Sequence, residues 1–354
     1  MRTTLFLLIS ALLACQLMAQ TTFSNRASEL GFQHSHDIMV QMGGGVVIFD
    51  FNNDQLEDVF LTGGNSISAL YQNVGNDSFV DITLAAGLLI TDSLSISGAV
   101  SGDIDNDGYR DLFLYSYYGN RNCLLRNNGD STFTDITFSA GVQGDSLWTH
   151  SASFGDINRD GFIDLYVGQF IEIPIVVSDS LGNLVSFNHL CIPNQLYLNN
   201  GDNTFSDAAH LLNAADTGCA LSTIMTDYDL DGDADLLVVN DFGAWVAPNT
   251  LYQNNFPNPF INVGNSSGIQ TGIYGMGIAY GDYDQDADID YYATNIGRNV
   301  LKRNMGNGQF IDTTDAAGVG NQWVQVDSLQ ATGWGCGFLD IDNDTKLDLY
   351  VSNG

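Results

Sequence analysis

Residues 227–239 read DYDLDGDADLLVV, in which an aspartate stands at every second position from Asp227 to Asp235 and apolar residues follow at once. Carboxylates this close together repel one another unless a positive charge compensates them. The short apolar run that follows is typical of a buried β-strand. The stretch therefore predicts a tight loop that gathers around a cation, immediately before a strand.

Five further copies of this acidic loop occur along the chain. They are DFNNDQLED from Asp50, DIDNDGYRD from Asp103, DINRDGFID from Asp156, DYDQDADID from Asp282 and DIDNDTKLD from Asp340. The loops start 53 to 71 residues apart, which is a spacing typical of a repeat architecture. The longest interval contains residues 170–190, which we expect to form an inserted hairpin around the sequence DSLGN.

Each acidic loop has the same surroundings. A glycine-rich apolar stretch precedes it (GGGVVIFD, 43–50), and a short hydrophobic strand follows it. A hairpin signature (QLYLNNGDN, 195–203) and an aromatic-led strand (STFTDITFSAGV, 131–142) complete the unit. Each unit thus holds about four short strands and lacks helical periodicity. Four-stranded units repeated in a ring make a β-propeller, whereas the coils of a β-solenoid are shorter than this period. We predict an all-β propeller.

The two ends of the chain leave the number of blades open. Residues 21–32 read as an aromatic-led strand, normally the last strand of a unit, and residues 347–354 end just before a hairpin signature is due. Six acidic loops therefore come with only five hairpin signatures. One interpretation is a six-bladed ring with an imperfect closing blade. The other, which we favour, is a chain truncated relative to its natural product.

The spacing inside the loops predicts calcium sites. Positions one, three, five and nine carry Asp or Asn in every copy, and position seven offers a backbone carbonyl. Calcium prefers such an all-oxygen set; magnesium, which holds its water tightly, is the alternative. An EF-hand would add a Glu at position twelve and flanking helices, whereas position twelve is apolar here. We expect up to six calcium ions, bound with dissociation constants on the order of 0.1–1 mM.

The predicted side-chain ligands are four residues in each loop. They are Asp50, Asn52, Asp54 and Asp58; Asp103, Asp105, Asp107 and Asp111; Asp156, Asn158, Asp160 and Asp164; Asp227, Asp229, Asp231 and Asp235; Asp282, Asp284, Asp286 and Asp290; and Asp340, Asp342, Asp344 and Asp348. The predicted carbonyl ligands at position seven are Leu56, Tyr109, Phe162, Asp233, Asp288 and Lys346.

The six loops should not bind equally. Position six needs a sharp turn, which Gly108, Gly161 and Gly232 provide and the other three loops lack. The first and third loops also replace one carboxylate by an amide, Asn52 and Asn158. We therefore predict that the second and fourth loops bind most tightly and the first most weakly.

The charge of the chain excludes two classes of partner, and its N-terminus predicts export. With 42 acidic and 10 basic residues, the net charge of −32 repels nucleic acid and anionic membranes. Arg2 followed by an apolar run too short to span a membrane predicts an export signal in residues 1–20. Lipid attachment at Cys15, within LLAC, is the alternative. We expect residues 21–354 to be secreted or held at the cell surface, as an outer-membrane lipoprotein in the second case. No later segment is long enough to cross a bilayer.

Four cysteines remain after the export signal, without a CxxC pair that would indicate zinc or redox chemistry. Cys191 and Cys219 are the candidate disulfide because they are close in sequence and an exported chain is oxidised. Buried free thiols are the alternative.

The repeats resemble a known family. The stretch YGMGIAYGDYDQDADIDYYATNIGRNVLKRNMGNGQFIDTTDAAGV (274–319) and residues 332–354 look like FG-GAP and VCBS repeats, which occur in integrin α-chain heads and exported bacterial proteins. They are similar in particular to the cartilage acidic protein family, whose propeller precedes an ASPIC/UnbV domain. The resemblance implies a calcium-binding, usually seven-bladed propeller used in binding or adhesion. This chain lacks an ASPIC/UnbV domain and a seventh unit, and both departures fit truncation.

No catalytic motif accompanies the repeats, so we expect a non-catalytic module that binds an extracellular glycan or protein. A calcium-dependent polysaccharide lyase is the enzymatic alternative; it needs a base, and the chain has only two lysines, Lys302 and Lys346. A structural spacer is the third interpretation.

His34 and His36 could bind a transition metal, but without an evident third ligand a surface loop is favoured. The candidate sugar-stacking residues, which could instead pack between blades, are Trp148, Trp245 and Trp323.

Overall fold

The structure is a computed structural model that describes residues 23–37, 44–117, 119–145, 147–172, 175–179, 181, 184–321 and 331–353. The predicted export signal, with Cys15, and Trp323 lie outside these residues.

The described chain is built from antiparallel sheets, five of them four-stranded. The first contains β1 (Val46–Phe49), β2 (Asp58–Leu61), β3 (Ala69–Asn73) and β4 (Phe79–Asp81), and the second β5 (Ile96–Gly102), β6 (Asp111–Ser116), β7 (Cys123–Asn127) and β8 (Phe133–Asp135). The third contains β9 (Thr149–Gly155), β10 (Asp164–Gln169), β13 (Gln195–Asn199) and β14 (Phe205–Asp207).

The fourth sheet contains β15 (Cys219–Thr226), β16 (Asp235–Asp241), β17 (Thr250–Gln253) and β18 (Ile261–Asn262), and the fifth β19 (Ile278–Gly281), β20 (Asp290–Ala293), β21 (Val300–Asn304) and β22 (Phe310–Asp312). β23 (Gly333–Leu339) and β24 (Asp348–Asn353) form a two-stranded sheet, as do β11 (Ile175–Ser178) and β12 (Leu184–Asn188). The helices are short: α2 (Ala27–Leu30), the 3-10 helix η1 (Leu88–Ser93), α3 (Thr137–Ala140), α4 (Gly264–Ser267) and α5 (Thr314–Ala317).

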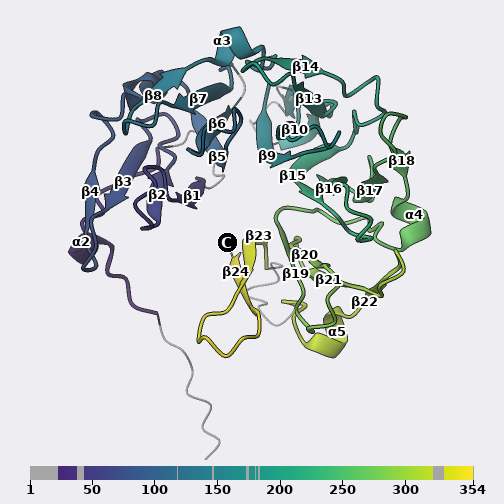
Figure 1. Ribbon diagram of the computed structural model, residues 1–354. Coiled ribbons are helices and arrows are strands. Elements are labelled where there is room, and N and C mark those ends of the chain that lie inside the picture. The colour runs from purple at the N-terminus through teal and green to yellow at the C-terminus, as the bar shows by residue number, and fades with distance from the viewer. Residues whose placement is uncertain are drawn as a thin grey trace, which may run out of the picture.

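The sheets follow one another around a common centre (Figure 1). In every sheet of the repeat, the strand that precedes an acidic loop is at one end of the strand order; these innermost strands are β1, β5, β9, β15, β19 and β23. They lie nearest the centre in Figure 1. The arrangement is a β-propeller-like, all-β fold, so the predicted repeat of four-stranded units is confirmed. A seven-bladed ring stays a prediction.

Apolar side chains between successive sheets form the core. Phe49 and Phe60 of the first sheet pack with Leu112 and Leu114 of the second, and equivalent clusters join the later pairs of sheets. This explains why β6, β10, β16 and β20, which follow acidic loops and have a sheet on either side, are apolar on both faces. The strand after the last acidic loop, β24, is largely exposed or half-buried.

The outer part of each unit differs from the expectation of an aromatic-led strand. In residues 131–142 the strand β8 spans only three residues, and the turn of helix α3 follows it. Asp135 Oδ1 accepts a hydrogen bond from the Thr137 backbone N–H, 3.0 Å away, which turns the chain out of the strand. The predicted strand in residues 21–32 is also wrong for the described part, where α2 forms instead and Phe32 packs on Tyr71.

The inserted hairpin predicted in residues 170–190 is confirmed as β11 and β12. A disulfide joins Cys191, just after β12, to Cys219 at the start of β15. It therefore ties the base of the insertion to the innermost strand of the next sheet.

Candidate metal centres

The first aspartate of each acidic loop folds the loop around its own carboxylate. Asp103 Oδ1 accepts the backbone N–H of Asp107 at 3.1 Å, and Asp103 Oδ2 accepts that of Gly108 at 2.9 Å. The same two hydrogen bonds recur in the other five loops. The carboxylates at positions three and five are thereby brought to one side of a tight turn.

Position six is the sharp turn that the sequence predicts. Gly108 has a φ of 90°, in the left-handed region that glycine adopts freely. The residues without that freedom, Gln55, Ala287 and Thr345, have φ values of 69°, 74° and 73°. At position six of these three loops, a residue with a side chain therefore adopts a backbone conformation that is uncommon for residues other than glycine.

The aspartate at position nine has a structural role within the sheet. Asp111 is fully buried; its Oδ2 accepts the Ile104 N–H at 2.9 Å and its Oδ1 accepts the Asn127 N–H at 2.7 Å. Burial raises the pKa of Asp111 to about 7. Equivalent pairs of hydrogen bonds are made by Asp58, Asp164, Asp235 and Asp290. This aspartate ties the acidic loop to the third strand of its sheet, a role that the sequence interpretation missed.

Four loops bring three carboxylates together, with one oxygen from each lying within 4.8 Å of the others. The groups are Asp103, Asp105 and Asp111; Asp227, Asp229 and Asp231; Asp282, Asp284 and Asp290; and Asp340, Asp342 and Asp344. The first and third loops form no such group among the described residues. There Asn52 Nδ2 donates to Asp54 Oδ2 at 3.0 Å, and Asn158 makes the same bond to Asp160.

The second and fourth loops fit a hard cation best. Within the described part of the chain, Asp105 Oδ1, Asp229 Oδ1 and Asp233 Oδ1 are buried carboxylate oxygens without a hydrogen-bond partner. Burial, and then repulsion from neighbouring carboxylates, raises the pKa of Asp105, and it raises that of Asp233 to about 6. Buried oxygens that lack donors are what an all-oxygen calcium site requires. The residues present therefore fit calcium, and Asp233 offers a carboxylate where only a carbonyl was expected.

In four of the six loops the side chain at position four links the loop to the next one around the ring. Asn53 Nδ2 donates to the Gly108 carbonyl at 2.9 Å, and Asn106 Nδ2 donates to the Gly161 carbonyl at the same distance. Gln285 makes the equivalent contact to the Thr345 carbonyl, and Arg159 bonds to the Asp231 carbonyl, one position earlier in the next loop. Leu230 stands at this position in the fourth loop and has no polar side chain. The recurrence of Asn, Arg or Gln at this position was the available signal for these inter-blade contacts.

A second set of contacts between neighbouring sheets comes from the hairpin asparagines. Asn254 Nδ2 donates to the Ile157 carbonyl of the previous loop at 2.8 Å. The corresponding bonds start from Asn127, Asn199 and Asn304. These residues were expected to serve the hairpin turn; they also hold neighbouring blades together at the acidic end.

In three loops a cation of the protein lies beside a carboxylate, and in the sixth loop it is Lys346, 3.7 Å from Asp344 Oδ2. In the fifth loop Arg303 contacts Asp284 and lies 2.9 Å from Asp286 Oδ2. In the fourth, Arg159 reaches over from the third loop and lies 3.2 Å from Asp233 Oδ2. Both arginines partly neutralise carboxylates that the sequence assigns to calcium.

The histidines have structural contacts in the described residues. His34 and His36 both bond to the Thr62 carbonyl, at 2.9 and 2.7 Å. His150 Nδ1 lies 3.0 Å from the Leu221 carbonyl, and burial lowers its pKa. His189 packs on Phe242 with the ring centroids 4.2 Å apart and the ring planes tilted by 35°.

The predicted sugar-stacking tryptophans have different environments. Trp148 is buried and packs on Tyr117 and Phe170, so for this residue the packing alternative holds. Trp245 is 78% exposed, and its Nε1 donates to the Tyr274 hydroxyl at 2.9 Å. Of the two lysines considered for a lyase, Lys302 donates to the Gly268 carbonyl, and Lys346 lies beside Asp344 in the sixth loop.

Comparison with known protein families identifies the same repeated unit. The family model for FG-GAP-like repeats matches residues 50–114 and 103–167, each match running from one acidic loop into the strand after the next. The chain therefore contains FG-GAP-like repeats, which suggests a β-propeller binding or adhesion module.

Among curated proteins, cartilage acidic protein 1 of Homo sapiens is 30% identical over 115 residues, covering 28% of this chain. The protein of the same name from Xenopus tropicalis is 29% identical over 115 residues. The chain thus has weak homology to these proteins, and the alignment spans 17% of the length of each.

Two solved structures align with much of the chain at low TM-scores. An Agrocybe aegerita lectin, described as recognising non-reducing terminal N-acetylglucosamine, aligns with a TM-score of 0.35 and 14% identity over 77% of this chain and 79% of its own. BBS1N in complex with ARL6DN aligns with a TM-score of 0.46 and 10% identity over 90% of this chain and 78% of its own. Within its described residues, the chain has no helix with the length and apolar character that crossing a membrane requires.

Proposed function

We propose that this chain is an exported, calcium-binding β-propeller that serves as a non-catalytic binding or adhesion module for an extracellular glycan or protein. The observation that carries the proposal is the set of converging carboxylates in the second and fourth loops, with buried oxygens that no described residue satisfies. Calcium would neutralise these carboxylates and fix the acidic loops, each of which connects the first two strands of one sheet.

The ring-like arrangement of sheets supports a role in binding. Rigid sheets present their connecting loops at two ends, and such loops commonly contact partners. The FG-GAP-like repeats and the likeness to cartilage acidic protein 1 support an extracellular setting. The N-terminal sequence supports export through a signal peptide, with a lipid anchor at Cys15 as the second form.

A retention assay tests this function. The calcium-loaded protein is passed over a panel of immobilised acidic and neutral polysaccharides and extracellular proteins, and the panel is repeated with a chelator. We expect retention on at least one surface that the chelator abolishes, without any release of unsaturated uronides. Absorbance from such uronides would identify a lyase instead. Retention on no surface would contradict the binding role and favour a spacer.

A further inference from the structure

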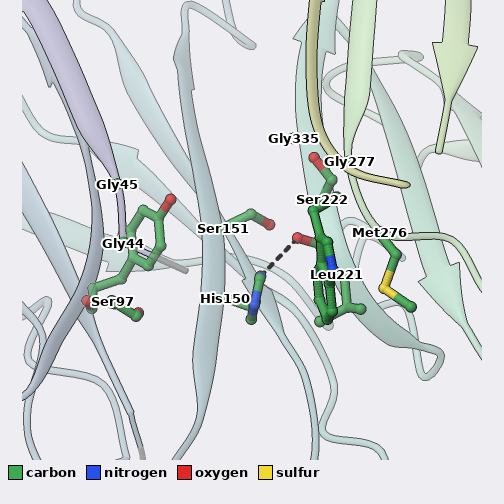
Figure 2. Close-up of a pocket in the computed structure, with 12 residues that line it drawn as sticks. Gly44, Gly45, Ser97, His150, Ser151, Leu221, Ser222, Met276, Gly277 and Gly335 are labelled. Carbon is green, nitrogen blue, oxygen red and sulfur yellow. Dashed lines mark hydrogen bonds between the residues drawn. The ribbon is translucent and has the colours of Figure 1, made fainter. Parts of the chain in front are cut away.

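A cavity of about 240 Å³ lies on the axis of the ring, among the starts of the innermost strands (Figure 2). All six units contribute to it, from Gly45 directly before β1 to Trp334 in β23. Each innermost strand runs from the cavity to its acidic loop. Five residues of strand separate the two, so the cavity lies roughly 16 Å from the loops.

Small residues shape this end of the axis. Five positions before the first aspartate of every loop stands a glycine or a serine: Gly45, Gly98, Ser151, Ser222, Gly277 and Gly335. A Cβ on Gly45 would come 2.7 Å from the Cα of Gly98, closer than real Cβ atoms approach. The small residues thus let neighbouring innermost strands lie close together around the hollow.

The described lining of the cavity is uncharged and combines a larger apolar surface with several polar side chains. It contains no Asp, Glu, Lys or Arg, although the chain has a net charge of −32. The hydroxyls of Tyr115 and Ser222 make no hydrogen bond to another described residue. His150 is oriented by its bond to the Leu221 carbonyl, drawn as a dashed line in Figure 2.

The lining residues indicate which chemical class of ligand fits the cavity. A cation would find carboxylates in the acidic loops and none here, and an anion would lack an arginine or a lysine. A purely apolar ligand would leave the Tyr115 and Ser222 hydroxyls unsatisfied. Trp334 and Met276 offer apolar surface beside the hydroxyls. The combination suits a neutral molecule that has both hydroxyls and an apolar face, which describes a pyranose ring.

We propose that this axial cavity binds one neutral pyranose unit of a glycan, with the Tyr115 and Ser222 hydroxyls hydrogen-bonding to the sugar and Trp334 packing on its apolar face. The volume is below the range of roughly 300–1,000 Å³ that is usual for drug-sized ligands, so a single sugar unit is the expected occupant. The inference rests on the proposed function, because it names the ligand class of that binding module.

The test is calorimetric titration of the calcium-loaded protein with glucose, galactose, mannose and N-acetylglucosamine, and with glucuronate as the charged counterpart. Ser222→Phe fills the cavity, and Ser28→Phe, on exposed α2, is the matched control. Tyr115→Phe removes one hydroxyl without changing the volume, so it keeps the test decisive if the larger substitution prevents folding.

We expect at least one neutral sugar to bind saturably and glucuronate to bind more weakly. Ser222→Phe should weaken binding at least tenfold, Tyr115→Phe severalfold, and Ser28→Phe should bind like the wild type. No binding of any neutral sugar, stronger binding of glucuronate, or unchanged binding by both cavity variants would overturn the inference. Calcium-dependent retention on another surface would leave the proposed function standing even then.

Discussion

The guanidinium of Arg303 lies 2.9 Å from Asp286 Oδ2 and also contacts Asp284, so the fifth acidic loop already holds a positive charge. Arg303 comes from the third strand of the same sheet. At the corresponding place in the fourth sheet, Gln253 Nε2 donates to Asp229 Oδ2 at 2.7 Å. Calcium entering the fifth loop must displace a guanidinium from the third strand, whereas the third strand brings a neutral amide to the fourth loop. The guanidinium beside the fourth loop, that of Arg159, comes from the third loop and contacts Asp233 instead of Asp229.

The first prediction is that Arg303→Gln raises the calcium affinity of the fifth loop. Exposed ion pairs are weak, so the expected gain is roughly two- to fivefold. It can be measured by calorimetric calcium titration of a protein in which Asp105→Asn and Asp229→Asn have silenced the second and fourth loops.

The reciprocal change, Gln253→Arg in the otherwise unchanged protein, is the control. It places a guanidinium beside Asp229 and should weaken calcium binding by the fourth loop. If neither substitution changes the titration, the third-strand residue does not govern these sites.

The second prediction separates structure from metal binding within one loop. Asp111→Asn places an amide against two backbone donors and should lower the free energy of unfolding by about 1–3 kcal/mol, with calcium or with chelator. Asp105→Asn should leave stability in chelator unchanged and reduce only the stabilisation by calcium. Urea unfolding of both variants in the two conditions measures this. Equal behaviour of the two variants would contradict the distinct roles of positions three and nine.

The local geometry of the loops could be predicted from the sequence, because it depends on neighbours a few residues apart. The first aspartate bonds to residues four and five positions later, and Gly108 supplies the turn between them. The alternation of acidic loop and apolar strand likewise identified the sheets, since both signals are local.

Contacts between units could not be predicted in this way. Asn254 reaches the Ile157 carbonyl 97 residues earlier in the chain, and Asn53 reaches the Gly108 carbonyl 55 residues later. Their partners are known only once neighbouring sheets are packed. The choice between stacking and packing stayed open for Trp148 for the same reason, because Tyr117 and Phe170, which pack on it, come from elsewhere in the chain.

The third prediction concerns Asp241 at the end of β16, outside the acidic loops. Its side chain is buried, and burial raises its pKa from 3.8 to about 6. The folded state therefore binds the proton more tightly than the unfolded state. Asp241 stabilises the protein most below about pH 4, and this contribution is lost as the pH rises through 6.

Asp241→Asn should remove this dependence. Relative to the wild type, the variant should gain about 2–3 kcal/mol of unfolding free energy between about pH 4 and about pH 7.5, since the shift is about two pKa units. Urea unfolding at four pH values measures the difference. A constant difference between variant and wild type would show that Asp241 ionises normally in the folded protein.

The fourth prediction concerns the disulfide between Cys191 and Cys219, which closes a segment of 28 residues. Loop entropy alone gives such a cross-link about 3–4 kcal/mol. Cys191→Ser with Cys219→Ser should therefore lower the melting temperature and expose the β11–β12 insertion to limited proteolysis. Reductant should reproduce both effects in the wild type and change nothing in the double variant. An insertion that resists protease after reduction would mean that other contacts hold it.

The most direct test of the account is thermal unfolding of the protein in calcium, in magnesium and in chelator, with bound calcium counted by equilibrium dialysis. If the acidic loops bind calcium and fix the blades, calcium should raise the melting temperature by about 5 °C or more at tenfold the dissociation constant, with several ions bound and magnesium much less effective. Asp105→Asn with Asp229→Asn should remove most of this shift. The same melting temperature in calcium and chelator, with no ion bound, would contradict the account.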